Sequence, residues 1–233
     1  RAVRDTRRFV RTNTNLGIIL LLAPLARAAA RTGDSLRSRL SEVLAELDVE
    51  DARAAYAAIR LAEPAGLGRV AEQDVRDEPT VSLREAMAIA AQWDTIAREY
   101  VTDYAVTFET GVPALCRARG RGLGWGAAVT ETYLALLAAV PDTLIARKCG
   151  EAAAREVSRQ AARVLASGEP GSTERRDALA RFDASLRREG NKLNPGTTAD
   201  LTAATLFVHL LEQSTGAVRP SHGGARWPRT KSS

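Results

Sequence analysis

Three short polar segments of the sequence come directly before apolar, helix-forming segments, and two of them carry an aspartate. They are TNTNLG with Asn13, Thr14 and Asn15, PDTLIARK with Asp142, Arg147 and Lys148, and NPGTTADL with Asn194, Gly196, Thr197, Thr198 and Asp200. The first turn of a helix has unpaired N–H groups and a partial positive charge, so it attracts anions. A carboxylate there caps the helix or, together with phosphates, holds a Mg²⁺ ion.

For each aspartate taken alone, a helix cap is the simpler interpretation. A helical bundle, however, can gather several helix starts at one opening. We therefore predict that Asp142 and Asp200 lie together as catalytic carboxylates and Mg²⁺ ligands, and that Arg147 and Lys148 bind phosphates. The other predicted contacts to ATP or substrate are Asn13, Thr14, Asn15, Asn194, Gly196, Thr197 and Thr198.

Glu109, in AVTFETGVPAL, is a third candidate carboxylate, because it stands just before a helix break in apolar surroundings. Burial among apolar groups raises the pKa of a carboxyl group, which is a common feature of catalytic acids and bases. We predict a catalytic Glu109 on this ground, and an exposed glutamate without a catalytic role is the alternative.

The elements that must position these residues are helices. Alanine is very frequent and aromatic residues make up only 5% of the chain, a composition that favours helix over strand. We predict an all-α fold, a single domain at 1–216 built as an orthogonal, bundled array of about nine helices. The remaining segment, 217–233, has no hydrophobic periodicity and is predicted to be a loosely ordered tail.

Several helices are predicted with their boundaries. The nearly all-apolar segment 16–30 is expected to be central, with a bend at Pro24. A helix is expected to start after Ser82, with Glu85 in a capping box, and to continue to about residue 108 with Trp93 on its buried face. The segment 144–165 is predicted to form one helix, and 199–213 the last long one.

Composition and missing motifs exclude several classes of protein. The net charge is +5, but the arginines alternate with acids and no basic stripe carries aromatic residues, so a nucleic-acid partner is not expected. The longest apolar run is broken at Pro24 and ends at Arg27, too short for a membrane span. GxxxxGK[ST], GxGxxG, GxSxG and HExxH motifs do not occur.

Three residues with reactive side chains, two cysteines and a histidine, are interpreted as having no catalytic role. Cys116 and Cys149 stand far apart without neighbours at metal-ligand spacing, which favours reduced thiols and a cytoplasmic protein. His209 lies in an apolar segment and is predicted to be a buried core residue.

Four segments of the sequence resemble the triphosphoribosyl-dephospho-CoA synthase family, and more closely its shorter bacterial and archaeal relatives. They are TNTNLGIILLLAPLA, FETGVPAL, PDTLIARKCGEAAAREV and NKLNPGTTADLTAATLFV. The resemblance implies an all-α enzyme that joins ATP to 3′-dephospho-CoA and releases adenine. A hydroxyl of dephospho-CoA attacks the ribose carbon that held adenine, and the triphosphate remains on the sugar. Mg²⁺ would accompany ATP.

This reaction requires a carboxylate near the positive charge that builds up on the sugar, a base for the hydroxyl, and donors for the triphosphate. The candidate residues supply all three kinds of group. Two departures from the family pattern stand out: Asn15 and Leu16 occupy the place of a His-Lys pair, and a segment rich in Pro-Gly, Asn and His that normally precedes Arg1 is absent. Since Arg1 stands within a predicted helix, we expect the chain to lack an N-terminal piece.

Two other functions fit the same residues. One is a related nucleotide-dependent transfer to a different phosphorylated substrate, in pterin-cofactor or one-carbon metabolism. The other is a non-catalytic helical interaction module in which the polar segments are only helix caps.

Overall fold

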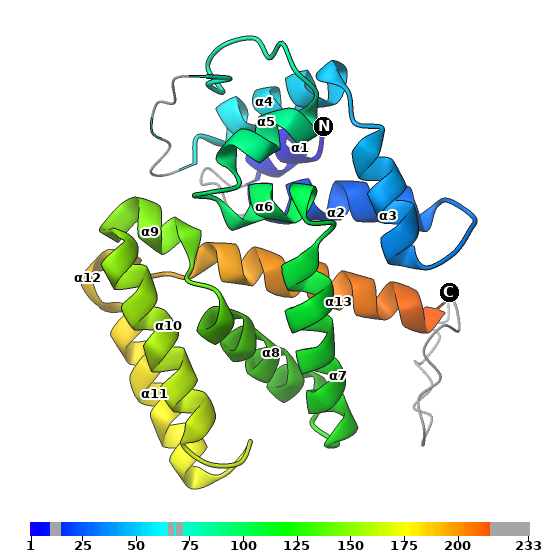
Figure 1. Cartoon of the computed structure of the whole chain (residues 1–233). Helices are drawn as coiled ribbons and strands as arrows, with labels where there is room; N and C mark the ends of the chain where they lie inside the picture. Colours follow the sequence, from blue (N-terminus) through cyan, green and yellow to red (C-terminus); the bar gives the residue numbers. More distant parts are fainter. Residues whose placement is uncertain (10–14, 65–67, 69–71, 215–233) are drawn as a thin grey trace, which may run out of the picture.

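The computed structural model describes residues 1–9, 15–64, 68 and 72–214, and this part of the chain contains helices and no strand, which confirms the all-α prediction (Figure 1). The elements in chain order are α1 (Ala2–Arg7), α2 (Leu16–Ala29), α3 (Leu36–Ala45), α4 (Val49–Ala62), α5 (Leu83–Ala90), α6 (Thr95–Val101), the π-helical η1 (Val106–Gly111), α7 (Val112–Gly120), α8 (Trp125–Ala139), α9 (Thr143–Cys149), α10 (Glu151–Ala166), α11 (Thr173–Leu186), α12 (Arg188–Asn191) and α13 (Gly196–Ser214).

Helix α13 crosses the middle of the molecule, with α1 to α6 on one side and α7, α8, α10 and α11 on the other (Figure 1). It packs against α2 and α8 through Leu201, Ala204 and Val208, which are at most 2% exposed. His209 of the same helix is 3% exposed, so the prediction of a buried core histidine is confirmed. The helix begins three residues before the predicted start, which places Asp200 in its second turn and not at its cap.

Two large groups of buried apolar side chains form the core. The first joins α2 to α6 with α13, and the second joins α8 to α11. Helix α8 contributes to both, because Leu136 belongs to the first group and Leu134 and Leu137 to the second. A single domain at 1–216 remains our prediction, and the predicted tail at 217–233 lies outside the described residues.

A proline in the apolar helix α2 is compensated by a tyrosine from another helix. Pro24 lacks an N–H, so the carbonyl of Leu20, four residues earlier, has no helical donor. The hydroxyl of Tyr100 in α6 donates to this carbonyl at 2.7 Å. The buried hydroxyl of Tyr104 donates to the next carbonyl, that of Leu21, at 3.0 Å. α2 and the α6 segment are therefore joined by polar as well as apolar contacts.

The predicted helix from Ser82 to about residue 108 is correct at its start and wrong in its length. Ser82 and Glu85 form the expected capping box. The helix nevertheless ends at Ala90, and Asp94 caps a new helix, α6, by accepting from the N–H groups of its first turn. Trp93 stands in the connection and is 38% exposed, so its predicted place in the core is wrong.

The predicted single helix at 144–165 is interrupted in the same way. Gly150 has φ of +87°, a conformation that glycine adopts without strain, and it separates α9 from α10. Together with several short segments, these breaks raise the number within the described residues to thirteen α-helical segments and one π-helical segment, above the predicted nine.

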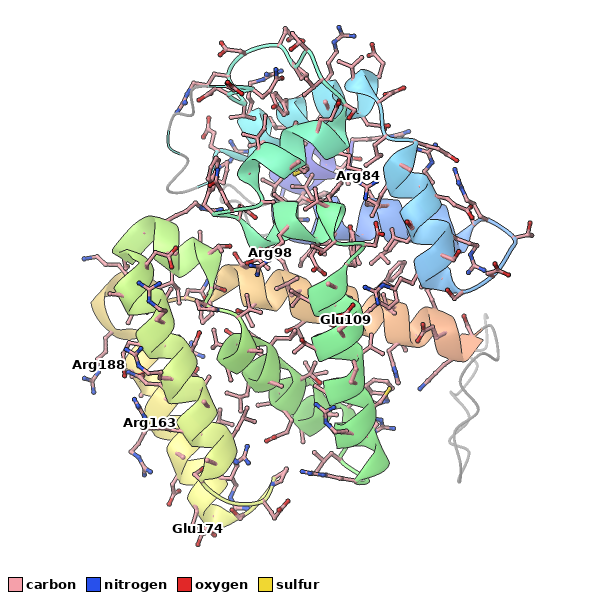
Figure 2. All side chains as sticks on the ribbon, in the orientation of Figure 1. Arg84, Arg98, Glu109, Arg163, Glu174 and Arg188 are labelled. Carbon is pink, nitrogen blue, oxygen red and sulfur yellow. The ribbon has the colours of Figure 1, made fainter. Side chains whose placement is uncertain are left out.

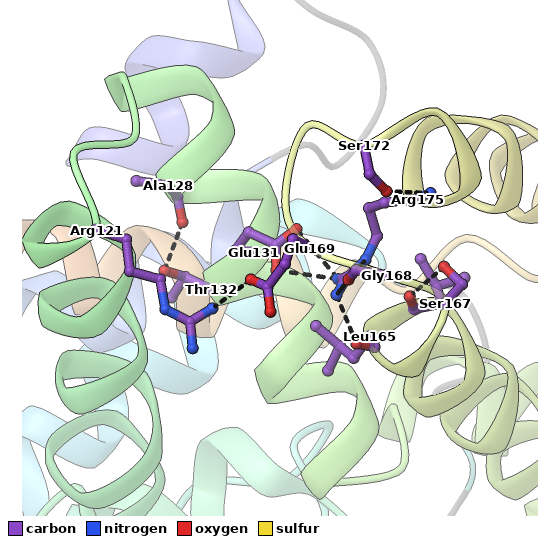
Figure 3. A network of polar contacts seen from close by, with 11 residues as sticks. Arg121, Ala128, Glu131, Thr132, Leu165, Ser167, Gly168, Glu169, Ser172 and Arg175 are labelled. Carbon is purple, nitrogen blue, oxygen red and sulfur yellow. Dashed lines mark hydrogen bonds and ion pairs between the residues drawn. The ribbon is translucent and has the colours of Figure 1, made fainter.

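A buried ion pair fixes the end of the second core group, between α8 and α11 (Figure 3). The guanidinium of Arg175 donates to both carboxylate oxygens of Glu131, at 3.2 and 3.1 Å, and also to the carbonyls of Leu165 and Gly168. The two side chains are only 6% and 17% exposed, so each charge depends on its partner.

In the described part of the chain, no single helix is long and apolar enough to cross a membrane, while the bent pair α8 and α9 passes that test together.

Candidate active site

A cavity of about 1130 Å³ opens where the starts of α2, α6, α9 and α13 meet α4 and α5. Seven of the predicted site residues line it: Asn15, Arg147, Lys148, Asn194, Gly196, Thr197 and Asp200. Segments that are far apart in the sequence are thus brought together at one place. Asn13 and Thr14 lie outside the described residues.

Asp200 is the predicted carboxylate that faces this cavity. Its side chain lies against the first turn of α2, so closely that a Cβ placed on Gly17 would be 2.0 Å from Oδ2. Burial raises the pKa of Asp200 to about 7, helped by the negative charges of Asp142 and Asp94 and opposed by a hydrogen bond from the backbone N–H of Ile18. The carboxyl group therefore exchanges its proton near neutral pH.

Asp142 lies behind the cavity wall and caps two helices at once. Its Oδ1 accepts from the N–H groups of Leu144 and Ile145, at 2.9 and 3.1 Å, and its Oδ2 accepts from the N–H and the hydroxyl of Thr198, at 2.7 and 2.8 Å. The residue is 1% exposed. Burial raises the pKa of Asp142, and the hydrogen bonds from Thr198 oppose this shift.

These contacts correct the sequence-based assignment of Asp142. Each carboxylate oxygen has two lone pairs, and four donors occupy all of them. Asp142 has no lone pair left for a metal ion or a substrate proton, so its role is to join the starts of α9 and α13. The same contacts occupy Thr198, which is 2% exposed and cannot reach a phosphate, contrary to the prediction.

Thr197 continues this layer of polar contacts. Its hydroxyl lies 3.2 Å from the hydroxyl of Thr143, which in turn accepts from the N–H of Thr95 at 3.3 Å. Residues at the starts of α13, α9 and α6 are therefore linked, and this linkage fixes the cavity wall.

Arg147 is the predicted phosphate-binding residue with the most defined position. It pairs with Asp94, and both side chains are about three-quarters buried. Its Nε is also buried and has no hydrogen-bond partner within the described part of the chain. A buried donor without a partner is costly, and the guanidinium of this residue supplies a positive charge to the wall of the cavity.

Asp94 was not among the predicted site residues. Its carboxylate Oδ1 accepts from the N–H groups of Ile96 and Ala97, at 2.8 and 3.3 Å, while Oδ2 faces Arg147. An aspartate followed by a threonine is a helix-start signal. Apolar residues continue at helical spacing on both sides of Asp94, and this pattern predicted one continuous helix and not a new helix start.

The remaining predicted residues in the cavity are less constrained. Asn15 precedes α2 and donates to the hydroxyl of Thr6 at 3.0 Å. Lys148 and Asn194 are exposed. Their side chains can therefore move toward a ligand.

Glu109 is not part of this site (Figure 2). It lies in the π-helical segment η1, its side chain is 61% exposed, and its carboxylate pairs with Arg37 of α3 at 2.7 Å. It is not among the residues that line the cavity. The predicted apolar surroundings are wrong, because this side chain points outward while Thr107 and Gly111 of the same segment are buried. Its position gives the predicted catalytic role no support.

The chain is similar in sequence to curated synthases over part of its length. It is 35% identical over 97 residues to the 2-(5''-triphosphoribosyl)-3'-dephosphocoenzyme-A synthase of Klebsiella pneumoniae, over 42% of this chain and 34% of that protein. A probable synthase of the same name from Pseudomonas syringae pv. tomato is 31% identical over 118 residues, 51% of this chain and 40% of that protein. The matched segments thus span less than half of these relatives.

Two further comparisons extend over nearly the whole chain. A solved structure from Archaeoglobus fulgidus that bears the name triphosphoribosyl-dephospho-CoA synthase superposes with a TM-score of 0.71 at 27% identity, covering 91% of this chain and 86% of that one. The family model described as CitG, ATP:dephospho-CoA triphosphoribosyl transferase, matches residues 1–219. The chain belongs to the ATP:dephospho-CoA triphosphoribosyl transferase family.

Proposed function

We propose that this protein transfers the triphosphoribosyl group of ATP to 3′-dephospho-CoA and releases adenine. The observation that carries the proposal is the meeting of Asp200, Asp94 and Arg147 at one cavity. A carboxyl group that titrates near neutral pH thus stands close to a cationic donor with an unused N–H. The family membership of the chain supports the same reaction.

Asp200 is the residue that we assign to the chemical step. The bond between C1′ of the ATP ribose and adenine breaks, and a bond from C1′ to the oxygen of a dephospho-CoA hydroxyl forms. Asp200 takes the proton of this hydroxyl, and adenine takes up one proton as it leaves, so the overall reaction releases no proton. A carboxylate beside C1′ also stabilises the positive charge that develops on the sugar.

The triphosphate is bound by the cationic side of the cavity. Arg147 lines the cavity as a cationic donor and remains paired with Asp94, which fixes the orientation of the guanidinium. Lys148, the next residue, adds a second positive charge. These side chains contact the phosphates, whereas Asp200 belongs near the sugar.

Mg²⁺ fits this cavity chiefly as an ion carried by ATP. Within the described residues there is no group of three or more His, Cys, Asp or Glu that could hold a metal, and Asp142 has no free lone pair. Protein sites for Mg²⁺ on nucleotides commonly supply only one or two carboxylates beside the phosphates. Asp94, beside Arg147 on the phosphate side of the cavity, is the residue that would supply one, and the bound ion would neutralise part of the triphosphate charge.

The proposal is tested with the purified full chain, ATP, Mg²⁺ and dephospho-CoA, by separating and quantifying free adenine. We expect adenine release that depends on dephospho-CoA. Asp200→Asn should reduce the rate by about 100-fold or more, the usual size of a general-base contribution. Asp183→Asn is the matched control, because Asp183 is exposed on α11 and, among the described residues, forms an ion pair with Arg187 alone. Its rate should be unchanged.

Two results would contradict the proposal. A folded protein that binds ATP but releases no adenine would indicate transfer to another phosphorylated substrate. A folded protein that binds no ATP would indicate a non-catalytic helical module. We expect the reaction to take place in the cytoplasm without a nucleic-acid or membrane partner.

A further inference from the structure

Trp93 lines the same cavity and has no role in the reaction described so far. It stands in the connection between α5 and α6, directly before Asp94, and is 38% exposed. The apolar residues Met87 and Ala90 of α5 line the same cavity. A large, partly exposed aromatic side chain thus lines the cavity one residue away from the aspartate that orients Arg147.

A second tryptophan provides an internal comparison. Trp125, at the start of α8, is also 38% exposed. Its ring, however, is already in use, because the guanidinium of Arg119 lies 4.5 Å from the ring centroid and the ring of His209 lies edge-on at 5.9 Å. Within the part of the chain that the structure describes, no ring or cation contacts the indole of Trp93. The exposed part of its indole lines the cavity without a ring or cation partner among these residues.

We propose that Trp93 is the stacking platform for an adenine base in this cavity. The inference rests on the proposed function for the identity of the base, since ATP and dephospho-CoA both carry adenine. Purine bases stack on indole rings, and each such contact typically contributes about 1–3 kcal/mol, which corresponds to roughly 5- to 150-fold in affinity. The base would then lie on Trp93 and the phosphates at Arg147 and Lys148, all of which line the same cavity.

Stacking also explains why this residue is not part of the core. An indole at an apolar helical position would ordinarily be buried. The break between α5 and α6 removes Trp93 from the buried face, and the cap formed by Asp94 fixes the place of the break. The same aspartate thus positions the guanidinium of Arg147 and ends the segment that carries the ring.

The test measures equilibrium binding of ATP, dephospho-CoA and inorganic tripolyphosphate to the full chain, by calorimetry. The variants are Trp93→Leu, Trp93→Phe and the control Trp125→Leu. We expect Trp93→Leu to weaken binding of one adenine-containing ligand by about 10-fold or more and to leave tripolyphosphate within about 2-fold. Trp93→Phe should retain most of the affinity, because phenylalanine also has a stacking face. Trp125→Leu should match the unsubstituted protein.

The ligand whose affinity falls identifies the base that stacks on Trp93. A lower affinity for ATP indicates the leaving adenine, and a lower affinity for dephospho-CoA indicates the adenine of the acceptor. Unchanged affinities for both, or an equal loss for tripolyphosphate, would overturn the inference. Binding is measured without turnover, so the two proposals can fail separately. If the protein releases adenine but Trp93→Leu binds both ligands normally, this inference alone is contradicted. If Trp93→Leu loses affinity for an adenine-containing ligand but the protein releases no adenine, only the proposed function is contradicted.

Discussion

The carboxylate of Asp200 and the backbone of Gly17 are in direct contact: a Cβ built on Gly17 would lie 2.0 Å from Oδ2 of Asp200 and 2.6 Å from its Cγ. Helices α13 and α2 therefore approach each other at the cavity so closely that only glycine fits at position 17. The contact keeps the Asp200 carboxylate at the start of α2, where the N–H of Ile18 donates to it. The position of the proposed base thus depends on a glycine in another helix.

Gly17→Ala should displace Asp200. Real Cβ atoms do not come within 3.0 Å of such a group, so either the carboxylate or α2 must move. We expect a loss of about 1–3 kcal/mol in the free energy of unfolding, typical of overpacking, and at least a roughly 10-fold loss of adenine release. Chemical denaturation and the adenine assay measure the two effects.

Gly126→Ala is the matched control for this substitution. Gly126 is also near the start of a helix, α8, but a Cβ there meets nothing within 4 Å. Since alanine favours helix over glycine, this control should be neutral or slightly stabilising. Equal effects at both glycines would show that the contact with Asp200 is unimportant.

Asp200→Asn should stabilise the protein at neutral and higher pH. The pKa of Asp200 is about 7 in the folded protein and near 3.9 in an unfolded chain, so the folded state binds the proton more tightly. The contribution of this group to stability is complete below about pH 4 and declines as the pH rises through 7. Asparagine stays uncharged and still offers an oxygen to the N–H of Ile18.

We therefore expect Asp200→Asn to match the parent at about pH 4 and to exceed it at about pH 8, by on the order of 2 kcal/mol. Urea unfolding at several pH values measures this difference. Asp183→Asn serves as the control, because its pKa is lowered by Arg187 and not raised. A constant difference between Asp200→Asn and the parent across this pH range would contradict the assigned titration.

Local signals in the sequence sufficed for the fold class and for several helix starts. Ser82 with Glu85, and Asp142 with Thr143, begin helices where predicted, because a cap depends only on residues a few positions apart. The cavity residues of α9 and α13 were predicted for the same reason. A local signal does not predict that Asp142 also caps a second helix, α13, because that contact is with Thr198, 56 residues away.

The missed residues also have a physical explanation. The apolar spacing before and after Trp93 predicted a continuous helix. Asp94 instead pairs with Arg147, a residue 53 positions away, and such a distant contact leaves no signal in the local spacing. Glu109 was misplaced because apolar neighbours in the sequence do not show which way a side chain points, and this one points outward to Arg37, 72 residues away. The spacing of residues in the sequence predicts neither contacts between distant residues nor the presence of a π-helical segment.

Tyr100→Phe should destabilise the protein. The substitution removes the hydroxyl that donates to the carbonyl of Leu20, and Pro24 leaves that carbonyl without a helical donor. An unsatisfied buried carbonyl typically costs about 1–3 kcal/mol. Thermal unfolding and denaturant titration measure the loss. In the double variant with Pro24→Ala, the helix regains its own N–H donor, so the cost of removing the hydroxyl should shrink; an unchanged cost would contradict this account.

Asp142→Asn distinguishes a cap from a catalytic residue. Asparagine presents one oxygen and one NH₂ group, so two of the four donors around Asp142 would face another donor in either orientation. We expect a loss of about 3 kcal/mol in the free energy of unfolding. Asp48→Asn is the matched control, because Asp48 caps a single helix at the surface and asparagine caps equally well. Its stability should be nearly unchanged. If Asp142→Asn instead retained full stability and lost only adenine release, Asp142 would be catalytic and the double cap would be incidental.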